Sequence, residues 1–248
     1  LNPEHPPLLK DLAALPFLFL NLYGDMQSQP FWTWENVNDR QWVAGNHLLY
    51  EAGNNPDRIL FASRLPTIIL AIIFGWMLFG WISSYYGKKI GLLTLFFFVT
   101  SPTFITHSRF VTTDLGAAFG FFLGLVYFLN FLEKQNLKSI LKLGIILGLV
   151  MLFKFSLILL LPAYLILTLL WVWLNGKTSI FIKLIGAGFI AIFIIYAVYA
   201  FHVWHYPHDQ HIRDVKYILG DYKVKSLASL DLWLVEHRLT RQLAQYFY

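Results

Sequence analysis

The 248-residue chain contains no cysteine, which excludes a disulfide framework and any thiolate chemistry. Charged residues are also scarce, at 13% of the chain, which is about half the share usual in a soluble domain. The sequence has no glycine-rich phosphate loop, no nucleophile elbow and no zinc-protease motif. These absences exclude the common soluble enzyme classes and indicate an integral membrane protein.

The chain is instead rich in long apolar runs. Hydrophobic residues make up 57% of it, and its mean hydropathy is +0.57. Six apolar spans are expected, at residues 60–82, 90–106, 115–132, 139–153, 155–174 and 180–203. In lipid, only helices and closed β-barrels satisfy the hydrogen bonds of the backbone. Barrel strands alternate polar and apolar residues, and these runs do not. The sequence therefore predicts an all-α fold, a polytopic transmembrane helical bundle.

The chain divides into three parts, at residues 1–57, 58–204 and 205–248. The first part is expected to be an extracytoplasmic loop with amphipathic helices in the membrane interface, over Leu8–Tyr23 and residues 35–52. The second part is the six-span bundle. The third part mixes charged and aromatic residues and is expected to form another extracytoplasmic surface segment.

The distribution of lysine predicts how the bundle is oriented. Seven lysines flank three short turns: Lys88, Lys89, Lys134, Lys138, Lys142, Lys177 and Lys183. The opposite short turns contain only Arg109 and Lys154. Because short cytoplasmic loops are rich in Lys and Arg, the lysine-rich side is expected to be cytoplasmic in a prokaryotic plasma membrane. The net charge of +5 follows from these turns and does not indicate a nucleic-acid partner.

Arg109 and Asp114 lie between two apolar runs, at the membrane rim, where ionisable groups are costly and usually functional. The planar guanidinium of Arg suits a phosphate, to which it can donate two parallel hydrogen bonds. A purely structural interpretation has about equal weight. Asp114 would then favour the start of a helix through the helix dipole, and Arg109 would anchor the chain in the interface.

Further cations lie on the same predicted side of the membrane. Arg64 is about one turn inside a span, Arg58 is just outside it, and Lys154 interrupts an apolar hairpin. Each cation alone is more typical of an interfacial anchor. Together with Arg109 they form a predicted ring at the depth of lipid headgroups, where a lipid phosphate would bind.

Four histidines recur at every third residue near the end of the bundle: His202, His205, His208 and His211. Such spacing can bind a metal, so a divalent metal remains a possible cofactor. Pro207 breaks any regular helix that would align the four rings. An interfacial loop rich in His and Tyr is therefore the favoured interpretation.

Four motifs together resemble the polytopic GT-C glycosyltransferases, the group of protein O-mannosyltransferases and lipid A aminoarabinose transferases. The segment His5-Pro6-Pro7-Leu8-Leu9-Lys10 resembles their His-Pro-Pro-Leu-x-Lys signature. Residues 62–66 resemble the Ala-Arg-Leu-Pro start of the next span, and residues 109–114 resemble an Arg-x-x-x-x-Asp turn. Lys154 matches a Lys that often follows a glycine-rich span in these enzymes. The order and spacing agree over residues 1–205.

This resemblance implies a sugar donor linked to polyprenyl or dolichyl phosphate, a protein or lipid acceptor, and inversion at the anomeric carbon. It implies catalytic roles for Asp114 and Arg109, lipid-phosphate binding by Arg109, Arg64 and Lys154, and positioning by His5, Pro6, Pro7 and Lys10. The family's catalytic base is an acidic residue shortly before the His-Pro-Pro signature. The chain is therefore expected to be a fragment, and inactivity of the fragment alone is an outcome to test.

Two alternatives come from other functional classes. A transporter or flippase for a lipid-linked or anionic substrate would also place cations among membrane helices. It should show repeat symmetry or broken helices at mid-membrane, whereas the charges here gather at one face. A non-catalytic membrane scaffold is the third interpretation, and it predicts no loss of ligand binding when Arg109 is changed.

Overall fold

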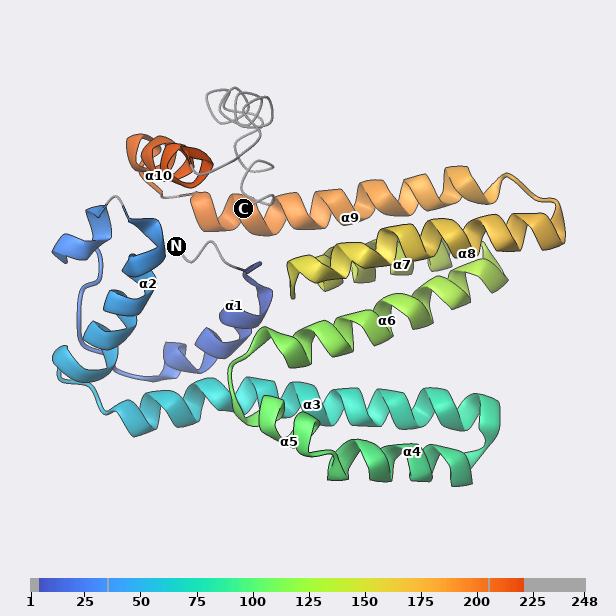
Figure 1. Ribbon diagram of the computed structural model, residues 1–248, viewed down its shortest axis with the longest axis horizontal. Helices are drawn as coiled ribbons and strands as arrows, with labels where there is room; N and C mark the ends of the chain where they lie inside the picture. The colour runs from blue at the N-terminus through green and yellow to red at the C-terminus, as the bar shows by residue number, and fades with distance from the viewer. Residues whose placement is uncertain (1–4, 35, 205, 221–248) are drawn as a thin grey trace.

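The computed structural model describes residues 5–34, 36–204 and 206–220, and these form helices and turns without a strand (Figure 1). The predicted all-α fold is therefore confirmed. In chain order the elements are α1 Leu8–Ala14, η1 Leu15–Phe19, η2 Pro30–Thr33, α2 Val37–Asn46, η3 His47–Glu51, α3 Pro56–Tyr86, α4 Lys88–Thr100, α5 Pro102–Arg109, α6 Thr113–Lys134, α7 Leu137–Met151, η4 Phe155–Leu159, α8 Leu160–Asn175, α9 Ile180–Val203 and α10 His208–Gly220. The η elements are short 3-10 turns, except η3, which is a π-helical turn.

Among the described residues, four helical segments are long and apolar enough to cross a membrane: α3, α6, η4 with α8, and α9. Helices α4 and α5 would make a fifth span if counted together, although they meet at a bend of 59°. Helix α7 has 15 residues, so it is about 22 Å long and shorter than a bilayer core of about 30 Å. Length and composition thus support four or five of the six expected spans, and the number six stays a prediction.

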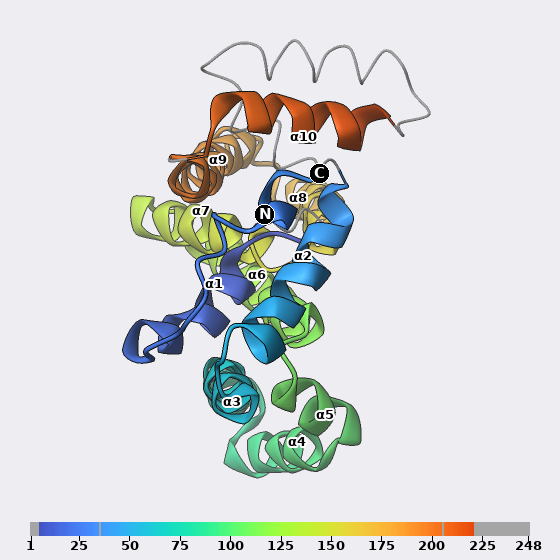
Figure 2. The same cartoon turned by 90° about the vertical axis from the view of Figure 1, so that its left-hand side faces the viewer.

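The long helices run back and forth, so that alternate connections lie at opposite ends of the bundle (Figure 1). Helices α1, α2 and α10 all lie at one end, and Figure 2 shows this end facing the viewer. The predicted lysine-rich turns lie at the other end. There α3 and α4 are joined by Gly87 alone, whose φ of +84° is a conformation that other residues rarely adopt.

Glycines allow α7 and α9 to pack with their backbones close together. A Cβ atom at Gly144 would lie 2.7 Å from the carbonyl oxygen of Ala187, and one at Gly148 would lie 2.9 Å from that of Ala191. Small residues four positions apart permit this close approach of the two backbones. The van der Waals contact that results stabilises the helix pair in lipid, where the hydrophobic effect does not drive helices together.

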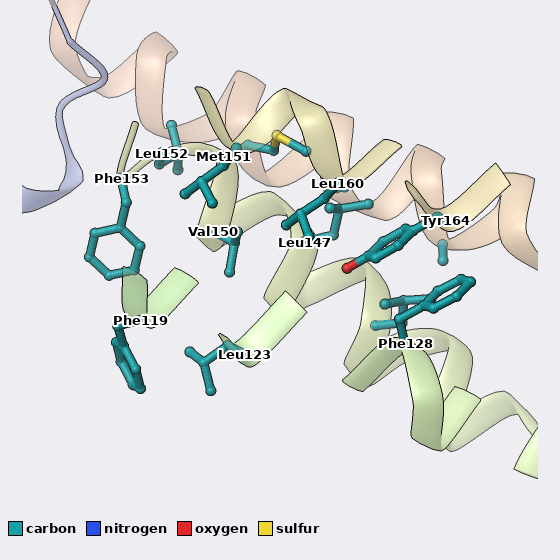
Figure 3. Packing of buried hydrophobic residues seen from close by; sticks show 14 of the residues in the cluster. Phe119, Leu123, Phe128, Leu147, Val150, Met151, Leu152, Phe153, Leu160 and Tyr164 are labelled. Carbon is teal, nitrogen blue, oxygen red and sulfur yellow. The ribbon is translucent and has the colours of Figure 1, made fainter. Parts of the chain in front are cut away.

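A second set of glycines brings α6 against η4 and α8. Gly120 and Gly124 leave no room for a Cβ atom beside the side chains of Leu157 and Leu160. In this interface the hydroxyl of Tyr164 donates to the carbonyl of Gly124 at 2.8 Å, and its ring stacks on Phe128 with centroids 4.0 Å apart. Figure 3 shows Phe128, Leu160 and Tyr164 in the buried cluster between the helices.

The segment before the bundle contains the two helices that the sequence predicts at the surface. Pro16 has no backbone N–H, and helix α1 gives way there to the short turn η1. Helix α1 buries Leu9 and Ala13, whereas Leu18 and Phe19 of η1 are 78% and 87% exposed. Such exposed apolar side chains fit an interfacial position, which remains a prediction.

Candidate active site

An ion pair between Asp114 and Lys154 lies at the end of the bundle where α1 packs. The Lys154 Nζ atom is 2.6 Å from Asp114 Oδ1, and the two side chains are 25% and 49% exposed. Asp114 is in the first turn of α6, next to the helix N-terminus, which favours a negative charge. Lys154 has an extended backbone conformation and directly precedes η4. Two residues predicted as site residues, 40 positions apart, are thus brought into direct contact.

Packing of Phe153 against α6 determines where Lys154 lies. Phe153 is 5% exposed, and a Cβ atom at Gly116 would lie 2.9 Å from its ring. Gly116 therefore leaves the space into which the Phe153 ring fits. Gly116 is two residues after Asp114, and Phe153 directly precedes Lys154. The distance of the ion pair depends on the absence of a side chain at Gly116.

His107 joins the same group from the end of α5. Its Nδ1 atom is 3.5 Å from Asp114 Oδ2 and 3.1 Å from the Thr112 hydroxyl oxygen. Helix α5 is attached to α3 by Thr67, whose buried hydroxyl lies 2.8 Å from the Arg64 carbonyl and 3.2 Å from the Ser108 carbonyl. His107 was not among the residues predicted from the sequence, although it lies in the same short segment as Arg109 and Asp114.

The predicted positioning segment, His5 to Lys10, lies against this group. The backbone N–H of Leu8 donates to the carbonyl of Leu152 at 3.1 Å, two residues before Lys154. The Lys10 ammonium turns back and donates to the carbonyl of His5 at 2.7 Å. Pro6 is buried and Pro7 precedes the first residue of α1. His5 is close enough to Asp114 to act electrostatically on its carboxylate.

Neither arginine of the predicted phosphate site joins this ion pair. The Arg64 guanidinium is 5.6 Å from the centroid of the Phe110 ring, a cation–π distance. Arg109 is the exposed last residue of α5. Within the described part of the chain, neither arginine forms an ion pair with Asp114. Binding of a lipid phosphate by the two arginines stays a prediction.

Comparison with protein families gives one match. Residues 57–201 match the dolichyl-phosphate-mannose-protein mannosyltransferase family. The chain belongs to this family. No curated protein and no solved structure matches the chain.

The matched segment of this mannosyltransferase-family protein runs from the start of α3 almost to the end of α9. It contains Arg64, Arg109, Asp114 and Lys154, and it includes neither His5 nor α1. The resemblance seen in the sequence is confirmed at the level of the family. Membership indicates a membrane protein with glycosyltransferase activity of the mannosyltransferase kind.

The histidine repeat of this family member shows no metal site within the described residues, where no group of three or more His, Asp or Glu side chains could hold an ion. His205 lies outside the described residues, as does the side chain of His208. His211 is 4% exposed and its ring meets the Tyr206 ring edge-on. His202 instead contacts Asp11 of α1.

A buried ion pair that the sequence analysis missed attaches α10 to α2. Both outer nitrogens of Arg40 bind Asp214, at 2.7 and 2.8 Å, and the Tyr206 hydroxyl donates to the same carboxylate at 2.5 Å. Burial lowers the pKa of the Arg40 guanidinium, but its bonds to Asp214 outweigh this effect and the pKa is raised overall. Burial raises the pKa of Tyr206, and the charge of Asp214 adds to the increase. No local pattern in the sequence indicates this pairing across 174 positions.

Proposed function

We propose that this chain is part of a membrane glycosyltransferase that transfers a sugar from a polyprenyl- or dolichyl-phosphate donor to a protein or lipid acceptor. The transfer takes place on the extracytoplasmic side, with inversion at the anomeric carbon. The observation that carries the proposal is the contact between Asp114 and Lys154, with His107 beside them, inside the segment that matches the family.

The chemistry of the leaving group explains why cations are needed. As the sugar departs, negative charge develops on the lipid phosphate, and donors held in place stabilise this charge without reorganising. Arg109 is exposed and ends α5, so its guanidinium is the candidate donor to the phosphate oxygens. Asp114 holds the Lys154 ammonium at 2.6 Å, which we interpret as orientation of a second cation toward the same phosphate.

The proposed side of the membrane follows from the lysine distribution. At the end of the bundle opposite the site, Lys88, Lys89, Lys134, Lys138, Lys142 and Lys177 are exposed. Short loops of this kind remain in the cytoplasm, so the site would face away from it. A lipid-linked donor could then reach the site laterally from the outer half of the bilayer.

A transfer assay tests the proposal directly. The full-length protein is reconstituted in liposomes with a radiolabelled sugar on dolichyl or polyprenyl phosphate, and transfer to an acceptor is measured. Arg109→Ala should lower the rate by about 10²- to 10³-fold, the usual effect of removing one such donor. Asp114→Asn should also reduce transfer, because it keeps the shape and removes the charge that holds Lys154.

Lys177→Ala, at the opposite end, is the control and should leave the rate unchanged. An unchanged rate in a well-folded Arg109→Ala protein would remove this residue from the mechanism. Movement of the lipid across the bilayer without sugar transfer would favour the transporter alternative.

A further inference from the structure

Helix α1 packs against α3, and two polar contacts attach it to other parts of the bundle. Its first residue donates a backbone hydrogen bond to Leu152, at the end of α7. On the other side, Asp11 Oδ1 lies 2.9 Å from His202 Nε2, at the end of α9. These two contacts fix α1 across the end of the bundle, between two helices that are distant in sequence. The segment from His5 to Lys10 is carried by this helix.

The His202 ring is held by oxygen acceptors on both sides. Its Nδ1 atom is 2.8 Å from the carbonyl of Val198, one turn earlier in α9, and its Nε2 atom faces the Asp11 carboxylate. A carbonyl and a carboxylate can only accept, so the ring satisfies both when both of its nitrogens carry hydrogen. The resulting cation lies in the last turn of α9, where the helix dipole favours positive charge.

We propose that Asp11 and His202 form a clasp that positions the His5 to Lys10 segment beside Asp114 and Lys154, and thereby sets the affinity for the lipid-phosphate donor. Both are positioning residues, because in the described part of the chain they contact each other, the carbonyl of Val198 and the ring of Phe201. The effect on affinity depends on the proposed function, whereas the placement of α1 does not.

Lys10 is the nearby charge that acts against the contact between Asp11 and His202. It is next to Asp11 and its positive charge opposes that of His202. The Lys10 ammonium is instead directed to the carbonyl of His5, which closes the turn at the start of α1. Breaking the clasp would leave α1 anchored by buried Leu9 and Ala13, so the helix would loosen without leaving the bundle.

A loosened α1 lowers the fraction of molecules that are competent to bind. The apparent dissociation constant rises in inverse proportion to this fraction, while molecules that do bind react as before. For a partly exposed ion pair we expect the KM for the lipid-linked donor to rise roughly twofold to fivefold with kcat nearly unchanged. A catalytic residue would lower kcat instead, so the two roles are separable.

The first experiment measures hydrogen exchange of the α1 backbone in the lipid-reconstituted chain, and it does not require activity. Asp11→Ala should speed exchange over residues 8–14, whereas Asp57→Ala, which removes an exposed carboxylate from α3, should not. His202→Gln should restore most of the protection relative to His202→Ala, because the Gln amide can still donate to Asp11. Unchanged exchange in both Asp11→Ala and His202→Ala overturns the clasp.

The second experiment measures KM and kcat for the donor in the same variants. A rise in KM that His202→Gln largely reverses supports the positioning role, and a fall in kcat at unchanged KM overturns it. The two proposals fail in different ways. If Asp11→Ala loosens α1 but the unmodified full-length protein transfers no sugar in the presence of donor and acceptor, the glycosyltransferase proposal fails and the clasp stands.

Discussion

At the scale of single residues, the site consists of one carboxylate surrounded by cationic or titratable groups. Asp114 contacts Lys154 and His107, and the His5 ring is within electrostatic range. Asp114 is half exposed, so water screens these interactions and each adds little to stability. Their arrangement is therefore better explained by binding an anion than by holding the fold together.

Lys154→Met tests this interpretation. The variant keeps the length of the side chain and removes its charge, so a lipid phosphate would lose one cation and Asp114 its closest partner. We expect sugar transfer to fall by about 10²-fold, while the free energy of unfolding changes by no more than about 1 kcal/mol. Transfer kinetics and thermal unfolding in detergent measure the two effects, and Lys177→Met is the matched control. A large loss of stability with little loss of transfer would contradict the proposed role.

At the scale of elements, glycines decide how the helices meet. Gly116, Gly120 and Gly124 recur at every fourth residue on the face of α6 that packs on Phe153, η4 and α8. The first of them is two residues from Asp114, so the packing of the helices and the geometry of the site are linked. The close approach of α6 to the chain after α7 brings Lys154 within 2.6 Å of Asp114.

Gly116→Val should separate these elements. The new side chain would overlap the Phe153 ring, and overpacking of this kind costs about 1–3 kcal/mol. We expect a lower unfolding temperature and a larger loss of transfer, because Lys154 is displaced from Asp114. Phe153→Leu in the Gly116→Val background should recover part of both. Gly188→Val is the control, because a Cβ atom there would meet nothing within 4 Å. Equal effects at the two glycines would contradict the link between packing and site.

At the scale of the whole molecule, the structure places the segments before and after the bundle at the same end. Helices α1 and α2 from the start of the chain and α10 from its end lie together there (Figure 2). The Arg40–Asp214 pair fastens α10 to α2, and the Asp11–His202 pair fastens α1 to α9. Parts of the chain that are far apart in sequence thus lie together at the end of the bundle that carries the candidate site.

Accessibility labelling tests the orientation of this arrangement. Single cysteines at Gly45 in α2 and at Asn136 before α7 lie at opposite ends of the bundle. The chain has no cysteine of its own, so a membrane-impermeant thiol reagent reacts only at the introduced position. We expect position 45 to be labelled from the extracytoplasmic side and position 136 from the cytoplasmic side. Labelling of both from the same side would contradict the topology and the proposed location of the site.

The sequence was sufficient for properties that depend on local composition. Apolar runs specify membrane helices because the bilayer requires every backbone group to be satisfied within its own segment. Asp114 was predicted to lie in the first turn of a helix, and α6 begins at Thr113. The number of spans was less predictable, because the apolar run at 139–153 folds into a helix only 15 residues long.

The amino-acid sequence by itself determined the class of protein, its helices and the short segment that carries Arg109 and Asp114. Only the tertiary structure decided which charges meet. Asp114 contacts Lys154 and not Arg109, and Asp11 contacts His202. Such pairs depend on side chains brought together across 40 and 191 positions by close helix packing, and one-dimensional periodicity carries no information about that packing.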